Sequence, residues 1–231
     1  MSNIFENRVQ MIFGSKQDED ETVVAMLAAA LRRDISFGQL KPDEKLKLNL
    51  LRQRYGGSNH SMRETLRLLS AEGLVAATAQ RGFRVTSATE ADLQDILFMR
   101  IEVEKMALEK ALTLGDVAWE GRVLAAHHAM HHSETIVQSD LSDLAALEWD
   151  NACRAFSYSL CEASGSPRLL DTQQKFYDQS RRFRLALLRE GRLDFSDRAR
   201  LHQALLDAVL RRDSAAALAG LTQLITTELQ A

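Results

Sequence analysis

From Thr89 to Ala231, the chain carries helix-forming patterns separated by short breaks and shows no strand pattern. This part starts with "TEADLQDILFMRIEVEKMALEKAL", where a threonine followed by acidic residues is typical of a helix start. Pro167 suits the first position of a later helix. Because the breaks are short, residues 89–231 are expected to form an all-α bundle. Its further helices are predicted over 116–138, 141–163, 168–189, 197–211 and 213–229.

The composition agrees with a mainly helical protein. Only 6% of the residues are aromatic and two are proline, whereas 45% are hydrophobic, which suffices for a core. Cys153 and Cys161 lack CxxC spacing and are expected to be reduced thiols in a cytosolic core. The first ten residues show no secretory signal, and no stretch has the roughly 18 apolar residues that a membrane span needs. We therefore expect a soluble, cytoplasmic protein without a membrane partner.

The part before Thr89 has a different pattern. Residues 1–20 show no sustained periodicity and are expected to form a flexible tail. Residues 21–88 are expected to form a separate domain that starts with a helix at Glu21. A turn at Pro42 leads into a short second helix. Glycines mark the predicted helix ends, at Gly38, at Gly56-Gly57 and at Gly73.

The helix after the Gly56-Gly57 pair has two different faces. Ser58 is placed to cap its N-terminus. Met62, Leu66 and Leu69 recur at helical spacing and predict one buried stripe. The segments "LVAAT" and "FRVTS" then predict two short strands joined by "AQRG". Three helices and a two-stranded ribbon follow one another in a winged helix-turn-helix. The polar residues away from the buried stripe are Asn59, His60, Arg63 and Arg67.

The charge of the chain is distributed unevenly. The whole chain has a net charge of −3. Residues 42–85 contain eight basic and four acidic residues, whereas the chain after residue 88 contains 16 basic and 22 acidic residues. A positive domain joined to an acidic one can bind phosphates although the protein is acidic overall.

The polar face of the third helix suits double-stranded DNA. A helix fits the major groove, where its N-terminal residues meet base edges and its dipole favours phosphate. The loop between the two strands offers an arginine to the neighbouring groove and a glycine for a tight turn. The same residues could instead form a solvated face, and the helix alone leaves this alternative open. The candidate DNA contacts are Ser58, Asn59, His60, Ser61, Arg63, Arg81 and Gly82.

The run "LKPDEKLKLNLLRQRYGGSNHSMRETLRLLSAEGLVAATAQRGFRV" resembles the winged-helix domain of GntR-type bacterial regulators. It shares the G-x-L-x-P turn that starts at Gly38, together with "RETL", "EGLV" and the "RG" of the wing. The helical remainder resembles the FCD ligand-binding domain, through Arg100 and Glu104 of R-x-x-x-E, "CEASGSPRLL", "YDQSRRFR" and "LHQALLDAVLRRDSAAAL". This resemblance covers residues 22–229 and implies a transcriptional regulator. "GDVAWEGRVLAAHH" is more weakly similar to the sub-branch that controls the use of small dicarboxylates or amino-acid-derived carbon.

The chain departs from the family at the recognition helix. Family members usually begin this helix with Ser-Arg-x-Pro-Val-Arg-Glu-Ala, whereas this chain has "SNHSMRET", without the first arginine and the proline. Asn49 stands where some members have a phosphate-contacting arginine, and it joins the candidate DNA contacts. The departures imply a different operator or weaker binding. Arg63, Arg81 and Gly82 keep the family type, so DNA binding is still expected.

Many FCD domains hold a divalent metal through an Asp-x-x-x-His pair and two further histidines. Only one strong ligand is retained here, so the resemblance implies that the metal is lost and that no cofactor is needed. Asp150 is an alternative ligand. The i,i+4 pairs His127/His131 and His128/His132 could also chelate a metal, but a surface stripe or protonatable patch is the favoured interpretation. The residues aligned with the four family ligands are Cys153, Ser157, His202 and Leu224.

The FCD resemblance implies an effector pocket in the bundle. Arg100 is the best anchor for a carboxylate, and Glu104 could orient it. Tyr158, Arg184 and His202 are candidates of second rank. Each of these residues could instead belong to a buried structural pair or to a surface charge. A further alternative is a degenerate pocket, in a bundle that serves only to dimerise.

These features predict a DNA-binding transcriptional regulator and not an enzyme, because no G-x-S-x-G, P-loop or G-x-G-x-x-G motif is present. Two chains should associate about a two-fold axis and present two recognition helices to a palindromic operator. A small organic acid would act as the effector. The alternative is an interaction or metabolite-binding protein whose DNA-binding domain has degenerated. A metal enzyme, the third possibility, would need a tightly bound ion that the sequence does not predict.

Overall fold

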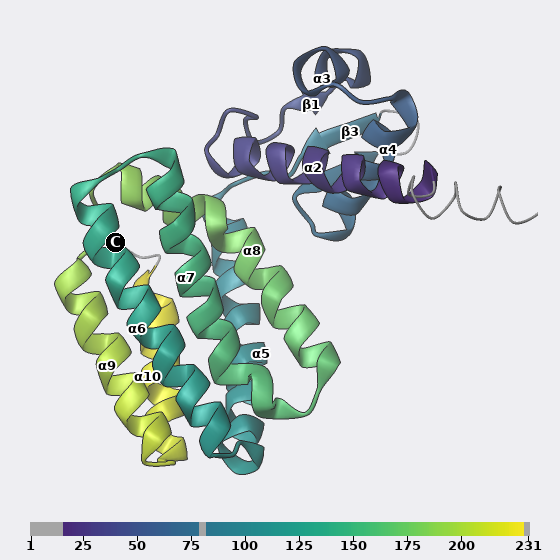
Figure 1. Cartoon of the computed structure of the whole chain (residues 1–231). Coiled ribbons are helices and arrows are strands. Elements are labelled where there is room, and N and C mark those ends of the chain that lie inside the picture. Colours follow the sequence, from purple (N-terminus) through teal and green to yellow (C-terminus); the bar gives the residue numbers. More distant parts are fainter. Residues whose placement is uncertain (1–15, 79–81, 229–231) are drawn as a thin grey trace, which may run out of the picture. The chain divides into compact units, whose positions relative to one another are not determined.

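A computed structural model describes residues 16–78 and 82–228 (Figure 1). The chain divides into two compact units, residues 1–87 (unit 1) and residues 88–231 (unit 2). Unit 1 combines helices with a small sheet, and unit 2 is helical. Among the described residues, no helix combines the length and the apolar character that crossing a membrane requires.

Unit 1 is a winged helix-turn-helix. Its three strands form an antiparallel sheet in the order β1-β3-β2. Val75 pairs with Val85 between β2 and β3, and Lys45 pairs with Arg84 between β1 and β3. The elements are α2 (Lys16–Ser36), β1 (Lys45–Leu46), α3 (Leu48–Tyr55), α4 (Asn59–Ala71), β2 (Val75–Thr78) and β3 (Gly82–Val85).

The core of unit 1 is built around the apolar face of α4. Met62, Leu66 and Leu69 are completely buried, which confirms the stripe that their spacing predicts. They pack in one cluster with Leu27 and Leu31 of α2 and with residues of the sheet. The side chain of Arg32 on α2 makes a bidentate ion pair with Glu72 at the end of α4, with N–O distances of 2.9 and 2.7 Å.

Two features of unit 1 differ from the sequence prediction. Helix α2 starts at Lys16, so residues 16–20 are helical and not part of the tail. The run "QDED" lacks apolar residues, which hides a helix from periodicity, but acidic residues near a helix N-terminus are favoured by the dipole. Strand β1 was not predicted at all. It has only two residues and is defined by pairing with β3, about forty positions later in the chain.

Gly57 lets α4 start close against α2. Its φ is +81°, and a Cβ there would lie 2.9 Å from Leu27 Cδ1 and 3.1 Å from Ser61 Oγ. Gly57→Ala therefore adds a clash to backbone strain, and we expect it to destabilise unit 1 by about 1–3 kcal/mol. Gly56 is the matched control, since its φ is +80° but a Cβ would meet nothing within 4 Å. Amide hydrogen exchange of α2–α4 should be faster in Gly57→Ala than in Gly56→Ala, and equal rates would contradict the close approach.

Unit 2 is a bundle of six α-helices and one short 3-10 helix within the described residues. Several helices start at the expected caps: Thr89 forms a reciprocal capping box with Asp92, and Pro167 occupies the first turn of α8. The elements are α5 (Glu90–Leu114), α6 (Val117–Ser139), α7 (Asp143–Cys161), η1 (Glu162–Ser164), α8 (Pro167–Arg189), α9 (Phe195–Leu210) and α10 (Ser214–Glu228).

Large aromatic side chains fill the centre of unit 2. Trp119, Trp149, Phe156 and Tyr177 are all buried. Trp119 on α6 donates a hydrogen bond from Nε1 to the carbonyl oxygen of Ser159 on α7, at 2.7 Å. Both tryptophans of the chain lie in unit 2, so tryptophan fluorescence reports on the folding of this unit alone.

Candidate nucleic-acid interface and candidate ligand site

The first turn of α4 is fixed by a reciprocal cap. Ser58 Oγ accepts a hydrogen bond from the backbone N–H of Ser61 at 3.0 Å, and Ser61 Oγ accepts one from the N–H of Ser58 at 2.9 Å. Ser58 is therefore the N-cap that the sequence predicts. The prediction that Ser61 faces DNA is wrong, because Ser61 is 1% exposed. Its hydroxyl takes the place that a Glu or Gln side chain usually has in a capping box.

The other polar residues of this turn are exposed. Asn59, His60 and Arg63 lie on the side of α4 that faces away from the core of unit 1. Arg52 of α3, which the sequence analysis did not single out, donates to Asn59 Oδ1 at 3.2 Å and to the Gly57 carbonyl at 3.3 Å. Because Asn59 Oδ1 is already engaged, the donors of Asn59 Nδ2 are what it offers to a base or phosphate. Arg52 thus positions the exposed turn.

The remaining DNA candidates lie on other elements of unit 1. Asn49 is exposed in the first turn of α3. Gly82 is exposed at the start of β3 with φ +85°, the left-handed conformation that a tight turn needs. Arg81 lies outside the described residues.

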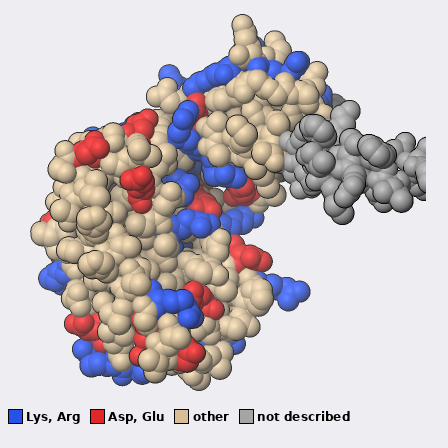
Figure 2. Space-filling model, viewed as in Figure 1, with Lys and Arg blue, Asp and Glu red and all other residues tan. Residues whose placement is uncertain are grey.

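Unit 1 carries exposed basic side chains on α3, on α4 and on its sheet. Figure 2 shows Lys and Arg atoms (blue) on the visible face of unit 1. Some are anchored within the unit: Arg54 is paired with Asp34 at 2.5 Å, and Arg67 is paired with Glu64. Such a surface attracts phosphates and concentrates DNA near the helix. The exposed cations of the sheet, of α3 with its N-cap residue, and of α4 are Lys45, Lys47, Arg52, Arg54, Arg63, Arg67 and Arg84.

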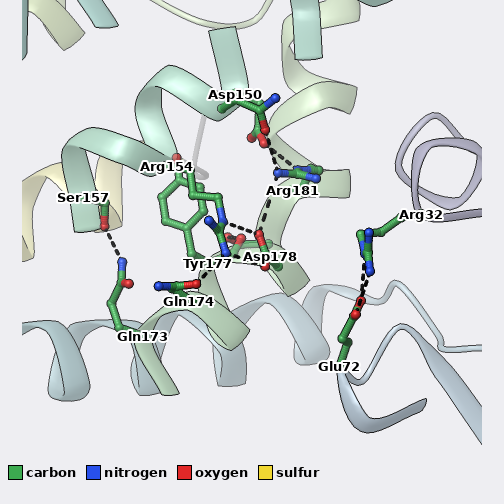
Figure 3. A network of polar contacts seen from close by, with 12 residues as sticks. Arg32, Glu72, Asp150, Arg154, Ser157, Gln173, Gln174, Tyr177, Asp178 and Arg181 are labelled. Carbon is green, nitrogen blue, oxygen red and sulfur yellow. Dashed lines mark hydrogen bonds and ion pairs between the residues drawn. The ribbon is translucent and has the colours of Figure 1, made fainter. Parts of the chain in front are cut away.

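The interior of unit 2 holds a chain of polar contacts across three helices. Arg100 Nε on α5 donates to Glu104 Oε1 at 2.9 Å. The hydroxyl of Ser157 on α7 donates to Glu104 Oε2 at 2.8 Å, and it accepts from Gln173 Nε2 on α8 at 2.8 Å (Figure 3). All four side chains are buried. Arg100 and Glu104 therefore form a buried ion pair, one of the alternatives that the sequence left open.

A second buried ion pair joins α7 to α8. Asp150 and Arg184 are both 0% exposed, and Arg184 donates to Asp150 Oδ1 from Nε at 3.0 Å and from Nη2 at 2.8 Å. Asp150 Oδ2 also accepts from Arg181 Nε at 2.5 Å (Figure 3). The guanidinium of Arg184 lies 3.9 Å from the centre of the Tyr177 ring, and that of Arg100 lies 4.6 Å from it. Asp150 is thus a partner of two arginines, which leaves it poorly placed to replace a metal ligand.

A third buried group joins α6, α7 and α9. Arg198 Nε on α9 lies 3.4 Å from Glu134 Oε1 on α6, and its Nη2 lies 3.8 Å from Cys153 Sγ on α7. Burial raises the pKa of Glu134, and Arg198 opposes this rise. His202 Nδ1 lies 2.8 Å from the carbonyl oxygen of Arg198, and because this oxygen only accepts, Nδ1 is the donor. The pair Arg198–Glu134 was missed from the sequence, since its partners are 64 positions apart.

The described residues do not fit the metal site that the FCD resemblance implies. Nowhere among them do three His, Cys, Asp or Glu side chains come together as a metal would require. Cys153 contacts a guanidinium, the Ser157 hydroxyl is used by Glu104 and Gln173, and Leu224 offers only hydrocarbon. On α6, His128, His131 and His132 are exposed and His127 is half-buried.

Four of the five effector candidates are spread over all three of these groups. Arg100, Glu104 and Arg184 lie in the ion pairs around Tyr177, and His202 lies beside Arg198. Tyr158 is half-buried on α7, and within the described residues it takes no part in these hydrogen bonds. Binding of an effector by these five residues stays a prediction.

His127 is expected to make the stability of unit 2 sensitive to acid. Its ring meets the Phe156 ring edge-on at 5.4 Å. Burial lowers its pKa below the usual 6.5, His131 and His128 lower it further, and Asp207 raises it. The folded state thus favours the neutral imidazole of His127. The contribution of this neutral ring to the free energy of unfolding is complete above pH 6.5, and it is lost as the pH falls through the folded-state pKa. In urea unfolding followed by tryptophan fluorescence, His127→Phe should lose less stability between pH 7 and pH 5 than the wild type. An unchanged loss would contradict this role.

Comparisons with known proteins identify a known domain in each of the two units. The profile of "Bacterial regulatory proteins, gntR family" matches residues 24–85, and that of the FCD domain matches residues 95–227. The chain is 37% identical over 190 residues to the HTH-type transcriptional repressor GlaR of Escherichia coli (strain K12), covering 81% of this chain and 85% of GlaR. It is 33% identical over 187 residues to the HTH-type transcriptional regulator BphR of Paraburkholderia xenovorans (strain LB400). This alignment covers 80% of this chain and 74% of BphR.

Solved structures share the fold. The structure of E. coli McbR/YncC matches with a TM-score of 0.68 at 19% identity, covering 88% of this chain and 93% of that one. A putative GntR regulator from Rhodococcus sp. RHA1 matches with the same TM-score at 20% identity, covering 90% and 96%. Both units of the fold, both domain profiles and the similar proteins indicate the same family. The chain belongs to the GntR family of DNA-binding transcriptional regulators and carries an FCD domain after its winged helix.

Proposed function

We propose that this regulator reads a palindromic operator as a homodimer in the cytoplasm, and that a small organic acid bound in unit 2 controls its affinity for DNA. The observation that carries the DNA part is the exposed first turn of α4, where Asn59, His60 and Arg63 stand clear of the core. A recognition helix enters the major groove with this end, and two-fold symmetry of the dimer matches two half-sites.

Arg63 is proposed as the main base or phosphate contact. Arg63→Ala should weaken operator binding by about 1–3 kcal/mol, roughly 5- to 150-fold, because an arginine that pairs with guanine contributes this much. Arg67→Ala is the matched control: Arg67 is one turn further along α4, and its guanidinium is paired with Glu64. Fluorescence anisotropy with a labelled operator measures both. Equal losses of operator affinity in the two variants would mean that Arg63 contributes only its positive charge and makes no specific contact with DNA.

The organic-acid part rests on the positive groups inside unit 2. Buried guanidinium groups can bind a carboxylate bidentately, and Arg100 is proposed as the anchor. Glu104, Arg184, Tyr158 and His202 are proposed as further contacts of the effector. An effector changes the affinity for DNA only as far as it binds the DNA-bound and the DNA-free regulator with different affinities. A panel of small mono- and dicarboxylic acids, added to the operator complex, should include one that changes the affinity. If none does and none raises the melting temperature of unit 2, the effector proposal fails.

Dimerisation is tested separately. Sedimentation velocity at micromolar concentration should give a dimer, and footprinting on a bound fragment should give two protected half-sites related by two-fold symmetry. A monomer that protects a single half-site would contradict the palindrome. DNA binding by α4 would survive that result.

A further inference from the structure

Arg52 connects α3 to the exposed first turn of α4. Its Nη1 donates to Asn59 Oδ1 at 3.2 Å, and its Nε donates to the carbonyl oxygen of Gly57 at 3.3 Å. Arg52 and Asn59 are both exposed. Because both acceptors are neutral oxygens, they leave the positive charge of the guanidinium unneutralised. This charge therefore lies beside the turn that the proposed function brings to DNA.

The contact with Arg52 fixes the orientation of the Asn59 carboxamide. A guanidinium carries only donors, so the carboxamide atom that faces it must be the oxygen Oδ1 and not the nitrogen Nδ2. A base amino group that approached Oδ1 would meet N–H groups of the same guanidinium, donor against donor. The pair therefore offers donors to DNA, from Asn59 Nδ2 and from the N–H groups of Arg52 that lie outside its two contacts.

The two purines differ in what they present in the major groove. Adenine presents an acceptor beside an amino donor, whereas guanine presents two neighbouring acceptors. An asparagine side chain without such a partner matches adenine, because its oxygen accepts from the amino group while its nitrogen donates. A pair that only donates matches guanine instead, as a bidentate arginine does.

We propose that Arg52 determines the base specificity of α4: by engaging Asn59 Oδ1, it makes this turn read guanine where Asn59 alone would read adenine. Arg52 is thus a positioning residue that acts through Asn59. The inference rests on the proposed reading of DNA by the first turn of α4. Exclusion of water from the groove strengthens a hydrogen bond from a charged donor, so the Arg52–Asn59 contact is stronger in the complex than in the unbound protein.

The test selects DNA from a pool with randomised operator positions, using the full-length wild type, Asn59→Ala, Arg52→Ala and the double variant. The base position at which Asn59→Ala loses its preference is the position that Asn59 reads. There the wild type should favour guanine over adenine by roughly 5- to 150-fold. Arg52→Ala should abolish this preference or invert it towards adenine. In the Asn59→Ala background, Arg52→Ala should leave the purine preference at that position unchanged, because the two residues act as a pair.

Arg67→Ala is the matched control for the loss of charge. Arg67 is an exposed arginine of α4 whose guanidinium pairs with Glu64. Its removal should lower the affinity for guanine-containing and adenine-containing operators by the same factor. Arg52 is exposed, so Arg52→Ala should leave unit 1 folded, and amide hydrogen exchange of α2–α4 checks this.

Three results would overturn the inference: a guanine-to-adenine ratio that Arg52→Ala leaves unchanged, an equal change of this ratio in the Asn59→Ala background, or a wild type that favours adenine at this position. If Asn59→Ala altered the preference at no position, the inference would fail while DNA reading by Arg63 survived. A wild type that selects no sequence at all would contradict the proposed function, and the inference with it.

Discussion

Asp150→Ala is expected to lower the free energy of unfolding of unit 2 by about 3–5 kcal/mol, because it leaves a buried guanidinium without a counter-charge. Asp150 and Arg184 are both 0% exposed, and Arg181 shares the same carboxylate. Urea unfolding followed by tryptophan fluorescence measures the loss, since both tryptophans lie in this unit.

Asp178→Ala is the matched control for Asp150. Asp178 also lies near Arg181, at 3.7 Å, and it pairs with Arg154 at 2.8 Å, but its side chain is 25% exposed. Its removal should cost at most about 1 kcal/mol, as for other solvent-accessible pairs. A loss in Asp150→Ala no larger than in Asp178→Ala would show that the buried pair does not hold α7 to α8.

Leu66→Ala is expected to destabilise unit 1 by about 2–5 kcal/mol, through lost apolar burial and the cavity that remains. Leu66 is completely buried on α4, in the cluster that also holds Leu27 and Leu31 of α2. The lost free energy of unfolding concerns unit 1, which carries the recognition helix. DNA binding should therefore decrease together with protection of α2–α4 in hydrogen exchange, while the tryptophan signal of unit 2 is unchanged.

Leu68→Ala provides the comparison on the same helix. Leu68 is 41% exposed, so its truncation removes little buried surface and should change stability by less than about 1 kcal/mol. Equal effects of Leu66→Ala and Leu68→Ala would mean that the apolar stripe of α4 does not form the core. Loss of the unit 2 signal in Leu66→Ala would mean that the two units do not unfold separately.

The sequence predicts those parts of the fold that local patterns encode. The stripe of Met62, Leu66 and Leu69 follows from helical spacing, and the caps at Ser58 and Thr89 follow from residue type and position. Strand β1 could not be predicted in this way, because two residues carry no alternating pattern and their partner strand is far along the chain.

The candidate sites were predictable to different degrees. The exposure of Asn59, His60 and Arg63 could be predicted, because these residues lie on the face of α4 opposite its buried apolar stripe. Ser61 was misassigned because a serine at this position suits both a groove contact and a cap, and only the geometry separates them. The ion pairs of Asp150 with Arg184 and of Glu134 with Arg198 depend on how distant helices pack. No local pattern in one sequence contains that information.

The most direct test of the central claim is to measure which genomic fragments the purified protein retains across a range of salt concentrations. The account predicts enrichment of a palindromic sequence, with an affinity that falls steeply as salt rises and that Arg63→Ala reduces. Absence of any enriched fragment at low salt would contradict DNA reading by α4. The interaction or metabolite-binding alternative, with a degenerate DNA-binding domain, would then be favoured.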